Sequence, residues 1–205
     1  MNEFGLRPIF TFVSHDREFI YKPRGFGSVE EMNAAIVENW NKVVGKDDIC
    51  YVLGDIMLNN NEIGLSLLRR LNGNIHIIAG NHDSYERICR YATETDNVLS
   101  VKWADVIHYK KHHFFLSHYP ALTGNWDLDK PFKARVINLC GHLHCQNKFI
   151  NMGNNTIYHV ELDCQDNMPI EINQIIEDIK YFCHLSIEEQ KEITSMEKYT
   201  NGTKN

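Results

Sequence analysis

The sequence predicts a layered α/β domain with an inner β-sheet, and two observations lead to this fold class. Short apolar runs without polar alternation, such as "ICYVLGD" at residues 49–55, are typical of strands that are buried on both faces of a sheet. Segments with apolar residues at helical spacing lie between these runs, so the first half of the chain has the order strand, helix, strand, helix. The 205 residues suffice for one domain with a sizeable core.

The clearest helix is expected to begin at Ser28 and to end at Gly45. Ser28 and Glu31 form a capping box, in which a serine and a glutamate three residues later satisfy backbone N–H groups of the first turn. Apolar residues then recur at helical spacing as far as Val43. The other elements expected in the first half are a strand at 9–13, a strand at 49–55, a helix at 62–73, a strand with its loop at 74–83 and a helix at 84–92.

The second half of the chain is richer in strands. The segment 104–120 is typical of a β-hairpin that turns near Lys110 and Lys111. No internal repeat, low-complexity tract or linker interrupts the sequence, so residues 1–205 are expected to form a single domain whose polar end, 195–205, is a flexible tail. The remaining expected elements are strands at 135–144 and 155–163 and a helix at 169–183.

Charge and composition argue against several classes of function. The net charge is −6 and no lysine and arginine cluster forms a stripe, so strong non-specific binding to nucleic acid is not expected. No basic segment followed by a long apolar run begins the chain, and no run of about eighteen apolar residues occurs, which predicts a cytoplasmic protein without a membrane segment. The six cysteines are scattered without a CxxC pair, and we expect reduced core thiols rather than disulfides or a structural zinc site.

Four of the expected strands end in polar residues that can bind a metal or act on a phosphate. Because α/β folds place ligands at the carboxyl ends of their strands, we expect these residues to converge. Carboxylate, amide oxygen and imidazole together suit divalent Mn, Fe, Ni or Zn rather than Ca. The residues are Asp55, Asn81, His82, His118, His142 and His144. The histidines interpreted instead as core or edge residues are His76, His108, His112, His113 and His159.

The motifs "GD", "GNHD", "SHYP" and "GHLH", in this order, resemble those of the calcineurin-like metallophosphoesterases. Small bacterial and phage-type members of that superfamily also resemble the segments "HDREFIYKPRGF", "SVEEMN", "ENWNKVV" and "YVLGDIM". The resemblance extends from about residue 9 to about residue 165. It implies a four-layer α/β/β/α sandwich with a dinuclear metal centre, in which metal-activated water hydrolyses a phosphodiester or phosphomonoester.

The resemblance also implies a role for each polar strand end. Asp55 would bridge two metals, whereas Asn81, His118 and His142 would complete the second metal site. His144 would belong to the first site.

Two residues of "GNHD" have an implied catalytic role. His82 would protonate the leaving alcohol or hold the phosphate, and Asp83 could orient His82. Upstream, "YKPRGF" contains Tyr21, Lys22 and Arg24, which either contact a phosphate or cap a surface loop. We favour the surface interpretation, because long basic side chains are mostly exposed.

The sequence departs from the family pattern in its first strand. There the family has a D-x-H pattern that supplies two ligands of the first metal, and an ungapped count places Phe10, Thr11 and Phe12 on it. A phenyl ring has no lone pair to donate. In an extended strand Phe10 and Phe12 point to the same side, where their rings would fill the first metal site. One bound divalent ion is therefore expected, and two remain possible.

Three residues offer a replacement for the missing ligands. A shifted register makes Asp16 and Glu18 a D-x-E pair, and His15 is a further substitute. The functional alternative is a catalytically inactive member of the family that binds phosphate, a nucleotide or another protein. The substrate, the metal and the oligomeric state stay open at the level of sequence.

Overall fold

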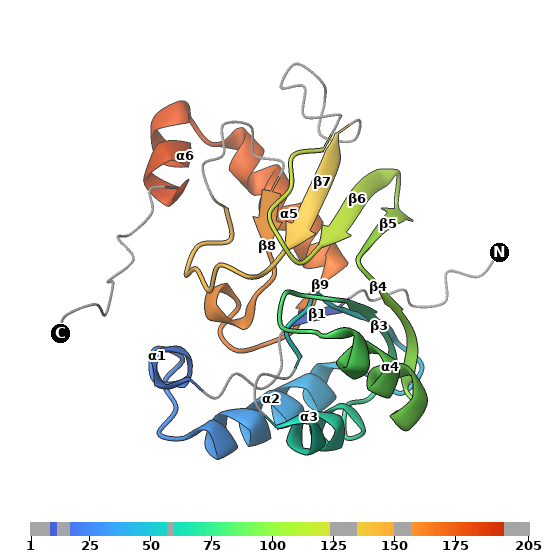
Figure 1. Cartoon of the computed structure of the whole chain (residues 1–205). Helices are drawn as coiled ribbons and strands as arrows, with labels where there is room; N and C mark the ends of the chain where they lie inside the picture. Colours follow the sequence, from blue (N-terminus) through green and yellow to red (C-terminus); the bar gives the residue numbers. More distant parts are fainter. Residues whose placement is uncertain (1–8, 12–16, 57–59, 124–134, 150–156, 195–205) are drawn as a thin grey trace.

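The computed structural model describes residues 9–11, 17–56, 60–123, 135–149 and 157–194, and it confirms an α/β fold. Two β-sheets lie next to each other, and helices flank them (Figure 1). The predicted tail at 195–205 lies outside the described residues. In the described part of the chain no helix is long and apolar enough to cross a membrane.

The first sheet has five strands in the order β4-β3-β2-β1-β9. Strands β1 to β4 pair in parallel, and β9 pairs antiparallel with β1. Strand β4 was not expected from the sequence. The bounds are β1 Ile9–Thr11, β2 Ile49–Val52, β3 Asn74–Ile78, β4 Val98–Lys102 and β9 Ile170–Glu171.

The second sheet has four strands in the order β5-β6-β7-β8. The predicted hairpin is confirmed, because β5 and β6 pair antiparallel and turn at Lys110 and Lys111, whose φ angles are 45° and 70°. Strand β7 then pairs in parallel with both β6 and β8. The bounds are β5 Ala104–Tyr109, β6 His112–Ser117, β7 Val136–Cys140 and β8 Ile157–His159.

The four predicted helices are present with somewhat different ends, whereas α1 and α6 were not expected from the sequence. Helix α2 begins after the predicted cap, since the Ser28 hydroxyl accepts a hydrogen bond of 3.1 Å from the Glu31 N–H. The helix expected from residue 169 starts at Ile172, because Ile170 and Glu171 pair with β1. The bounds are α1 Glu18–Tyr21, α2 Val29–Val43, α3 Asn61–Leu68, α4 Tyr85–Glu94, α5 Ile172–His184 and α6 Ile187–Thr194, with a 3-10 turn at Leu162–Cys164.

Alternate residues of β2 are buried in two different apolar clusters. Cys50 and Val52 lie in the cluster that β2 and β3 form with α2, α3 and α4, whereas Tyr51 lies in the cluster that includes the second sheet and α5. Figure 1 shows α2, α3 and α4 together on one side of the five-stranded sheet. The strand is thus covered on both faces, as the unbroken apolar run predicted.

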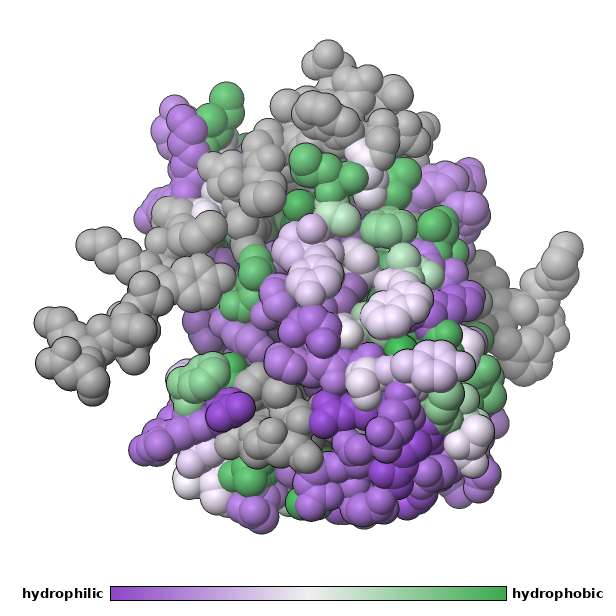
Figure 2. Space-filling model, in the orientation of Figure 1, coloured by the Kyte–Doolittle hydropathy of each residue, from purple (hydrophilic) through white to green (hydrophobic). Residues whose placement is uncertain are grey.

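On the face seen in Figure 2, hydrophilic side chains dominate over the lower helices, and hydrophobic ones are more frequent over the second sheet. Two exposed apolar side chains are Val106 of β5, which is 55% exposed, and Trp103, which directly precedes β5 and is 67% exposed.

Candidate metal centre

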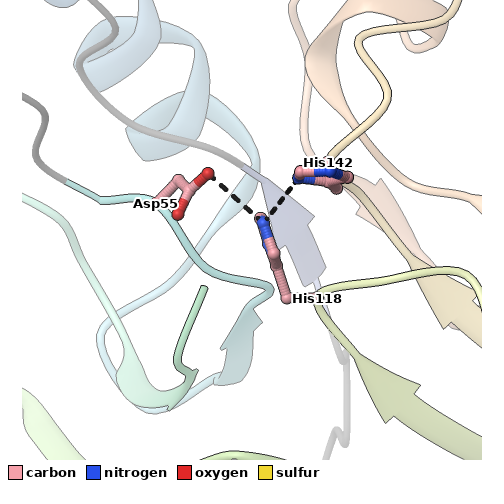
Figure 3. A group of neighbouring side chains, drawn as sticks. All are labelled: Asp55, His118 and His142. Carbon is pink, nitrogen blue, oxygen red and sulfur yellow. Dashed lines mark hydrogen bonds and ion pairs between the residues drawn. The ribbon is translucent and has the colours of Figure 1, made fainter. Parts of the chain in front are cut away.

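Loops at the carboxyl ends of four strands bring the predicted residues together. Asp55 follows β2 and Asn81 follows β3 in the first sheet, whereas His118 follows β6 and His142 follows β7 in the second. Figure 3 shows Asp55, His118 and His142 pointing toward one another from these separate loops. One ligand atom from each of the three lies within 4.8 Å of the others. The centre therefore lies where the two sheets meet.

The Nε2 atom of His118 lies close to one potential ligand atom of each of three other residues. It lies 2.9 Å from Asn81 Oδ1, 3.0 Å from His142 Nδ1 and 3.3 Å from Asp55 Oδ2. The other ring nitrogen, Nδ1, lies 2.9 Å from the carbonyl oxygen of Leu53, which can only accept a hydrogen bond. In the neutral ring the proton is thus on Nδ1. The lone pair of Nε2 is then on the side of the three other potential metal-ligand atoms.

These spacings fit a divalent transition metal. Nitrogen and oxygen ligands bind such an ion at about 2.1 Å, so two ligands at a right angle lie about 3.0 Å apart and two at the tetrahedral angle about 3.4 Å apart. The distances of 2.9 to 3.3 Å around His118 Nε2 fall in or next to this range. The carboxylate, amide and imidazole donors are those that Mn, Fe, Ni and Zn accept.

Protonation at the centre follows from the same contacts. Burial disfavours the charge of Asp55, but hydrogen bonds from the His118 ring and the His82 backbone outweigh burial and hold the pKa of Asp55 below its ordinary value. Burial would lower the pKa of His118, yet its hydrogen bond with Asp55 raises it. Burial lowers the pKa of His142, and the neighbouring His118 acts in the same direction. The lowered pKa of Asp55 and the raised pKa of His118 thus share one cause, the contact between the carboxylate and the ring.

The backbone of the ligand loops is strained. Asp55, His142 and His144 have φ angles of 52°, 76° and 49°, in the left-handed region that non-glycine residues rarely adopt. Gly54 and Gly80 allow the loops to approach closely, because a Cβ at Gly54 would overlap His118 and a Cβ at Gly80 would overlap Asp55. Strain of this kind persists where the surrounding structure enforces it, and it is concentrated at functional sites.

Asp83 is buried beneath the ligand loops. Its carboxylate accepts hydrogen bonds from the N–H groups of Asp55 at 2.8 Å and Gly80 at 2.8 Å, and from the Tyr91 hydroxyl at 2.6 Å. Burial raises the pKa of Asp83, although the bonds from Gly80 and Tyr91 act in the opposite direction. These contacts join the loops that carry Asp55 and Asn81. The expectation that Asp83 orients His82 stays a prediction.

His82 lies at the rim of the centre. Its backbone N–H donates a hydrogen bond of 2.9 Å to Asp55 Oδ1, and its backbone carbonyl accepts one of 2.7 Å from Arg87. The residue itself is exposed. The backbone of His82 is thereby fixed beside the candidate ligands, and the residue is accessible from solvent.

His144 contacts a buried ion pair instead of the His118 group. Its Nδ1 lies 3.2 Å from Asp163 Oδ2, and Asp163 binds the Arg24 guanidinium with both oxygens, at 3.0 and 2.6 Å. The Arg24 side chain is only 1% exposed, so the surface interpretation of this residue was wrong. A histidine whose Nδ1–H is bound by a carboxylate presents Nε2 as a metal ligand. Asp163 and Arg24 therefore position His144.

The register of β1 bears on the missing ligands. Phe10 is opposite Tyr51 and Thr11 is opposite Val52, three residues before Asp55. The expectation that Phe10 stands at a first-site ligand position stays a prediction. Phe12, His15 and Asp16 lie outside the described residues.

The remaining substitute, Glu18, begins α1 and is exposed. It forms an ion pair with Lys22 one helical turn later, and its side chain is 64% exposed. This orientation does not support Glu18 as a ligand.

Sequence reasoning missed three functional candidates near His144: Arg24, Glu161 and Asp163. A signal for two of them was present, because Glu161 and Asp163 follow the strand β8 in the same way that Asp55 follows β2. The signal for Arg24 was absent, since an isolated arginine in a loop is usually exposed.

Comparisons with known proteins place the chain near two proteins without a stated function. No protein-family model matches the chain. The uncharacterized protein MJ1445 of Methanocaldococcus jannaschii is 32% identical over 176 residues, which cover 83% of this chain and 88% of that protein. The crystal structure of the protein of unknown function AQ665 from Aquifex aeolicus has a TM-score of 0.61 and 20% identity, and it covers 84% of this chain and 99% of that one. The latter likeness shows the fold alone.

A second solved structure, YfcE, is described as a phosphoesterase from E. coli. It has a TM-score of 0.41 and 17% identity, and the match covers 76% of this chain and 78% of that one.

Proposed function

The chain belongs to the same family as the uncharacterized protein MJ1445, and we propose that it is a metal-dependent phosphoesterase. One observation carries the proposal: an amide oxygen, an imidazole nitrogen and a carboxylate oxygen surround His118 Nε2 at 2.9 to 3.3 Å. The same residues belong to the "GD", "GNHD", "SHYP" and "GHLH" motifs that resemble calcineurin-like metallophosphoesterases.

The residues that would hold the ion are Asp55, Asn81, His118 and His142. A divalent ion there would polarise a phosphoryl oxygen and lower the pKa of a bound water. The chain prepares the site for it: Leu53 fixes the tautomer of His118, and Asp83 holds the loop of Asp55. Because Asp83 and Leu53 are buried and contact other protein groups, we assign them a positioning role.

We propose His82 as the general acid. Its backbone is bound to Asp55, and the residue is exposed at the rim of the centre. A side chain in this position can reach an ester oxygen without itself binding the ion. Its function is to give a proton to the alcohol that leaves when the phosphorus–oxygen bond breaks.

We further propose a single domain with the four-layer α/β/β/α arrangement. The two sheets, the cluster of α2, α3 and α4 on the first sheet, and the packing of α5 in the cluster that includes the second sheet support it. One ion is expected at the His118 group. His144, positioned by Asp163, is available to a second ion that shares Asp55.

The experiment measures hydrolysis of two phosphodiesters by the Mn²⁺-loaded protein, one with a p-nitrophenol leaving group and one with an alkyl alcohol. We expect metal-dependent hydrolysis of both. His82→Ala should retain bound Mn²⁺ and should slow the alkyl ester by about 10²–10⁴-fold, with a smaller effect on p-nitrophenol, which leaves without protonation. His184→Ala, at the exposed end of α5, is the matched control and should change neither rate.

Equal losses for the two leaving groups would contradict the general-acid role of His82. Mn²⁺ binding without hydrolysis of phosphodiesters or phosphomonoesters would contradict the enzymatic proposal. That second result would favour the alternative of a phosphate-binding or protein-binding module built on the same fold.

A further inference from the structure

We propose that Cys145, His159 and Glu161 form a second, separate metal site that takes a thiophilic divalent cation of the Zn²⁺ class. None of these residues belongs to the group around His118. From the sequence, His159 was interpreted as a core or edge residue, and reduced core thiols were expected rather than a structural zinc site because no CxxC pair is present. The three residues come from two segments, the loop after β7 and the end of β8.

The three ligand atoms are already close together. Cys145 Sγ lies 2.8 Å from Glu161 Oε1, and His159 Nδ1 lies 3.1 Å from the same oxygen. All three ligand atoms lie within 4.8 Å of one another. A thiolate, an imidazole and a carboxylate are the side chains that bind Zn²⁺, at about 2.0 to 2.3 Å. Only small side-chain shifts separate the observed arrangement from such a site.

The charge of Glu161 supports a cation at this position. Its side chain is 0% exposed, and its ion-pair partner among the described residues is His159, which is also 0% exposed. A buried carboxylate normally has a lysine, an arginine or a metal ion as its partner. With the Cys145 thiolate, the Glu161 carboxylate and a neutral His159, a divalent cation makes the buried site electrically neutral.

Proton positions account for both states of the site. Without metal, the Cys145 thiol and the His159 Nδ1–H donate to Glu161. On metal binding the thiol proton leaves to solvent. The His159 proton moves to Nε2, which lies 3.8 Å from the sulfur of Cys140, a weak acceptor.

An ion at this site would also fix the loop that carries His144. Glu161 accepts hydrogen bonds of 2.9 Å from the backbone N–H of His144 and 2.9 Å from that of Cys145. The same carboxylate would thus bind the cation and the backbone of the "GHLH" loop. The inference does not depend on hydrolysis at the candidate centre, because it concerns other side chains.

Cobalt substitution tests the proposal. Co²⁺ bound by a thiolate has a charge-transfer absorption that oxygen and nitrogen ligands do not give, and the ligands proposed for the His118 group contain no sulfur. The purified protein is expected to contain zinc and, after exchange, to show this absorption. Cys145→Ser should abolish the absorption and lower the zinc content by about one ion per chain, whereas Cys89→Ser, at an exposed thiol, should change neither.

A second measurement uses the unaltered chain, so that it does not depend on the folding of a variant. Alkylation by iodoacetamide is located by mass spectrometry with and without a chelator. Cys145 should be protected until zinc is removed, while Cys89 should react in both states. Absence of a thiolate–cobalt absorption in the unaltered protein, or its retention in Cys145→Ser, would overturn the proposal and leave a hydrogen-bonded polar cluster.

Discussion

The carboxylate of Asp83 accepts a hydrogen bond of 2.8 Å from the backbone N–H of Asp55, one of the proposed metal ligands. The same carboxylate binds Gly80, so it joins the loops after β2 and β3. The two loops belong to neighbouring strands and carry ligands that must keep a fixed spacing. A buried carboxylate that accepts several N–H bonds provides that spacing.

We expect Asp83→Asn to weaken Mn²⁺ binding by about 10- to 100-fold, the usual effect of removing a group that orients metal ligands. The amide would present an NH₂ group to at least one backbone donor, and the free energy of unfolding should fall by about 1.5–3 kcal/mol. Calorimetric titration and urea unfolding measure the two quantities. Tyr91→Phe is the control, since it removes the hydroxyl donor alone and should leave Mn²⁺ affinity within about threefold of the unaltered protein. Equal effects of the two variants would contradict this role.

Gly80→Ala tests the close approach of the two loops. A Cβ at Gly80 would lie 2.7 Å from the backbone nitrogen of Asp55 and would overlap its carboxylate, so Asp55 must move. We expect loss of Mn²⁺ binding together with destabilisation of about 1–3 kcal/mol from overpacking. Gly45→Ala is the matched control, because the new Cβ would make ordinary contacts with Asp48 and the glycine has no positive φ. Unchanged Mn²⁺ affinity in Gly80→Ala would show that Asp55 is not a ligand in its observed position.

The Arg24–Asp163 pair predicts a pH-dependent stability. Burial disfavours the charge of Asp163, but hydrogen bonds from His144 and Arg24 hold its pKa well below the ordinary value. Because the folded-state pKa is depressed, the pair stabilises the fold above the unfolded-state pKa of about 3.9, and this contribution is lost as the pH falls through the lower, folded-state pKa. Breaking a buried pair costs about 3–5 kcal/mol.

We therefore expect Asp163→Asn to lower the free energy of unfolding by about 3–5 kcal/mol at pH 7. The difference from the unaltered protein should shrink below about pH 4, where Asp163 of the unfolded chain begins to be protonated. Urea unfolding followed by circular dichroism over this pH range measures it. Glu177→Gln removes the exposed ion pair with Lys180 and should cost at most about 1 kcal/mol at every pH. A constant difference between pH 7 and pH 3 for Asp163→Asn would refute the charged pair.

Residue patterns allowed much of the fold and the ligand group to be predicted. The capping box at Ser28 and the apolar run of β2 act locally, so their consequences are visible in the sequence. Strand β9 was predicted as part of a helix. One apolar residue followed by one polar residue, Ile170 and Glu171, is compatible with either a helix or a strand. Their pairing with β1, about 160 residues away in the chain, decides the outcome.

For the candidate site too, residues in local motifs were predicted, whereas a residue that depends on a distant partner was not. Asp55 and His118 follow apolar strands in recognisable motifs, and convergence at strand ends is a rule of the fold. Arg24 was missed because its burial depends on Asp163, a partner far away in the sequence that no local pattern reveals. Ungapped counting placed Phe10 at a ligand position, and its strand β1 pairs in parallel with β2, with Phe10 opposite Tyr51. Register is a property of two strands and cannot be read from one.

The number of Mn²⁺ ions per chain is the last prediction. Mn²⁺ prefers oxygen and nitrogen ligands to thiolate, so it reports on the His118 group and not on Cys145. The group offers four donors to one ion, whereas a second ion would have Asp55 and His144 from the described part of the chain. Two protein donors rarely hold a labile divalent ion, so we expect one Mn²⁺ per chain after desalting.

Elemental analysis and electron paramagnetic resonance measure the number and the coupling of the ions. His118→Ala should lose the bound Mn²⁺, whereas His113→Ala, an exposed histidine of β6, should retain it. Two coupled ions per chain would contradict the prediction. Because Glu18 is exposed and paired with Lys22, that outcome would assign the missing ligands to His15 or Asp16. Substitution of each to alanine, with the same count of ions, would then identify which of the two completes a dinuclear centre.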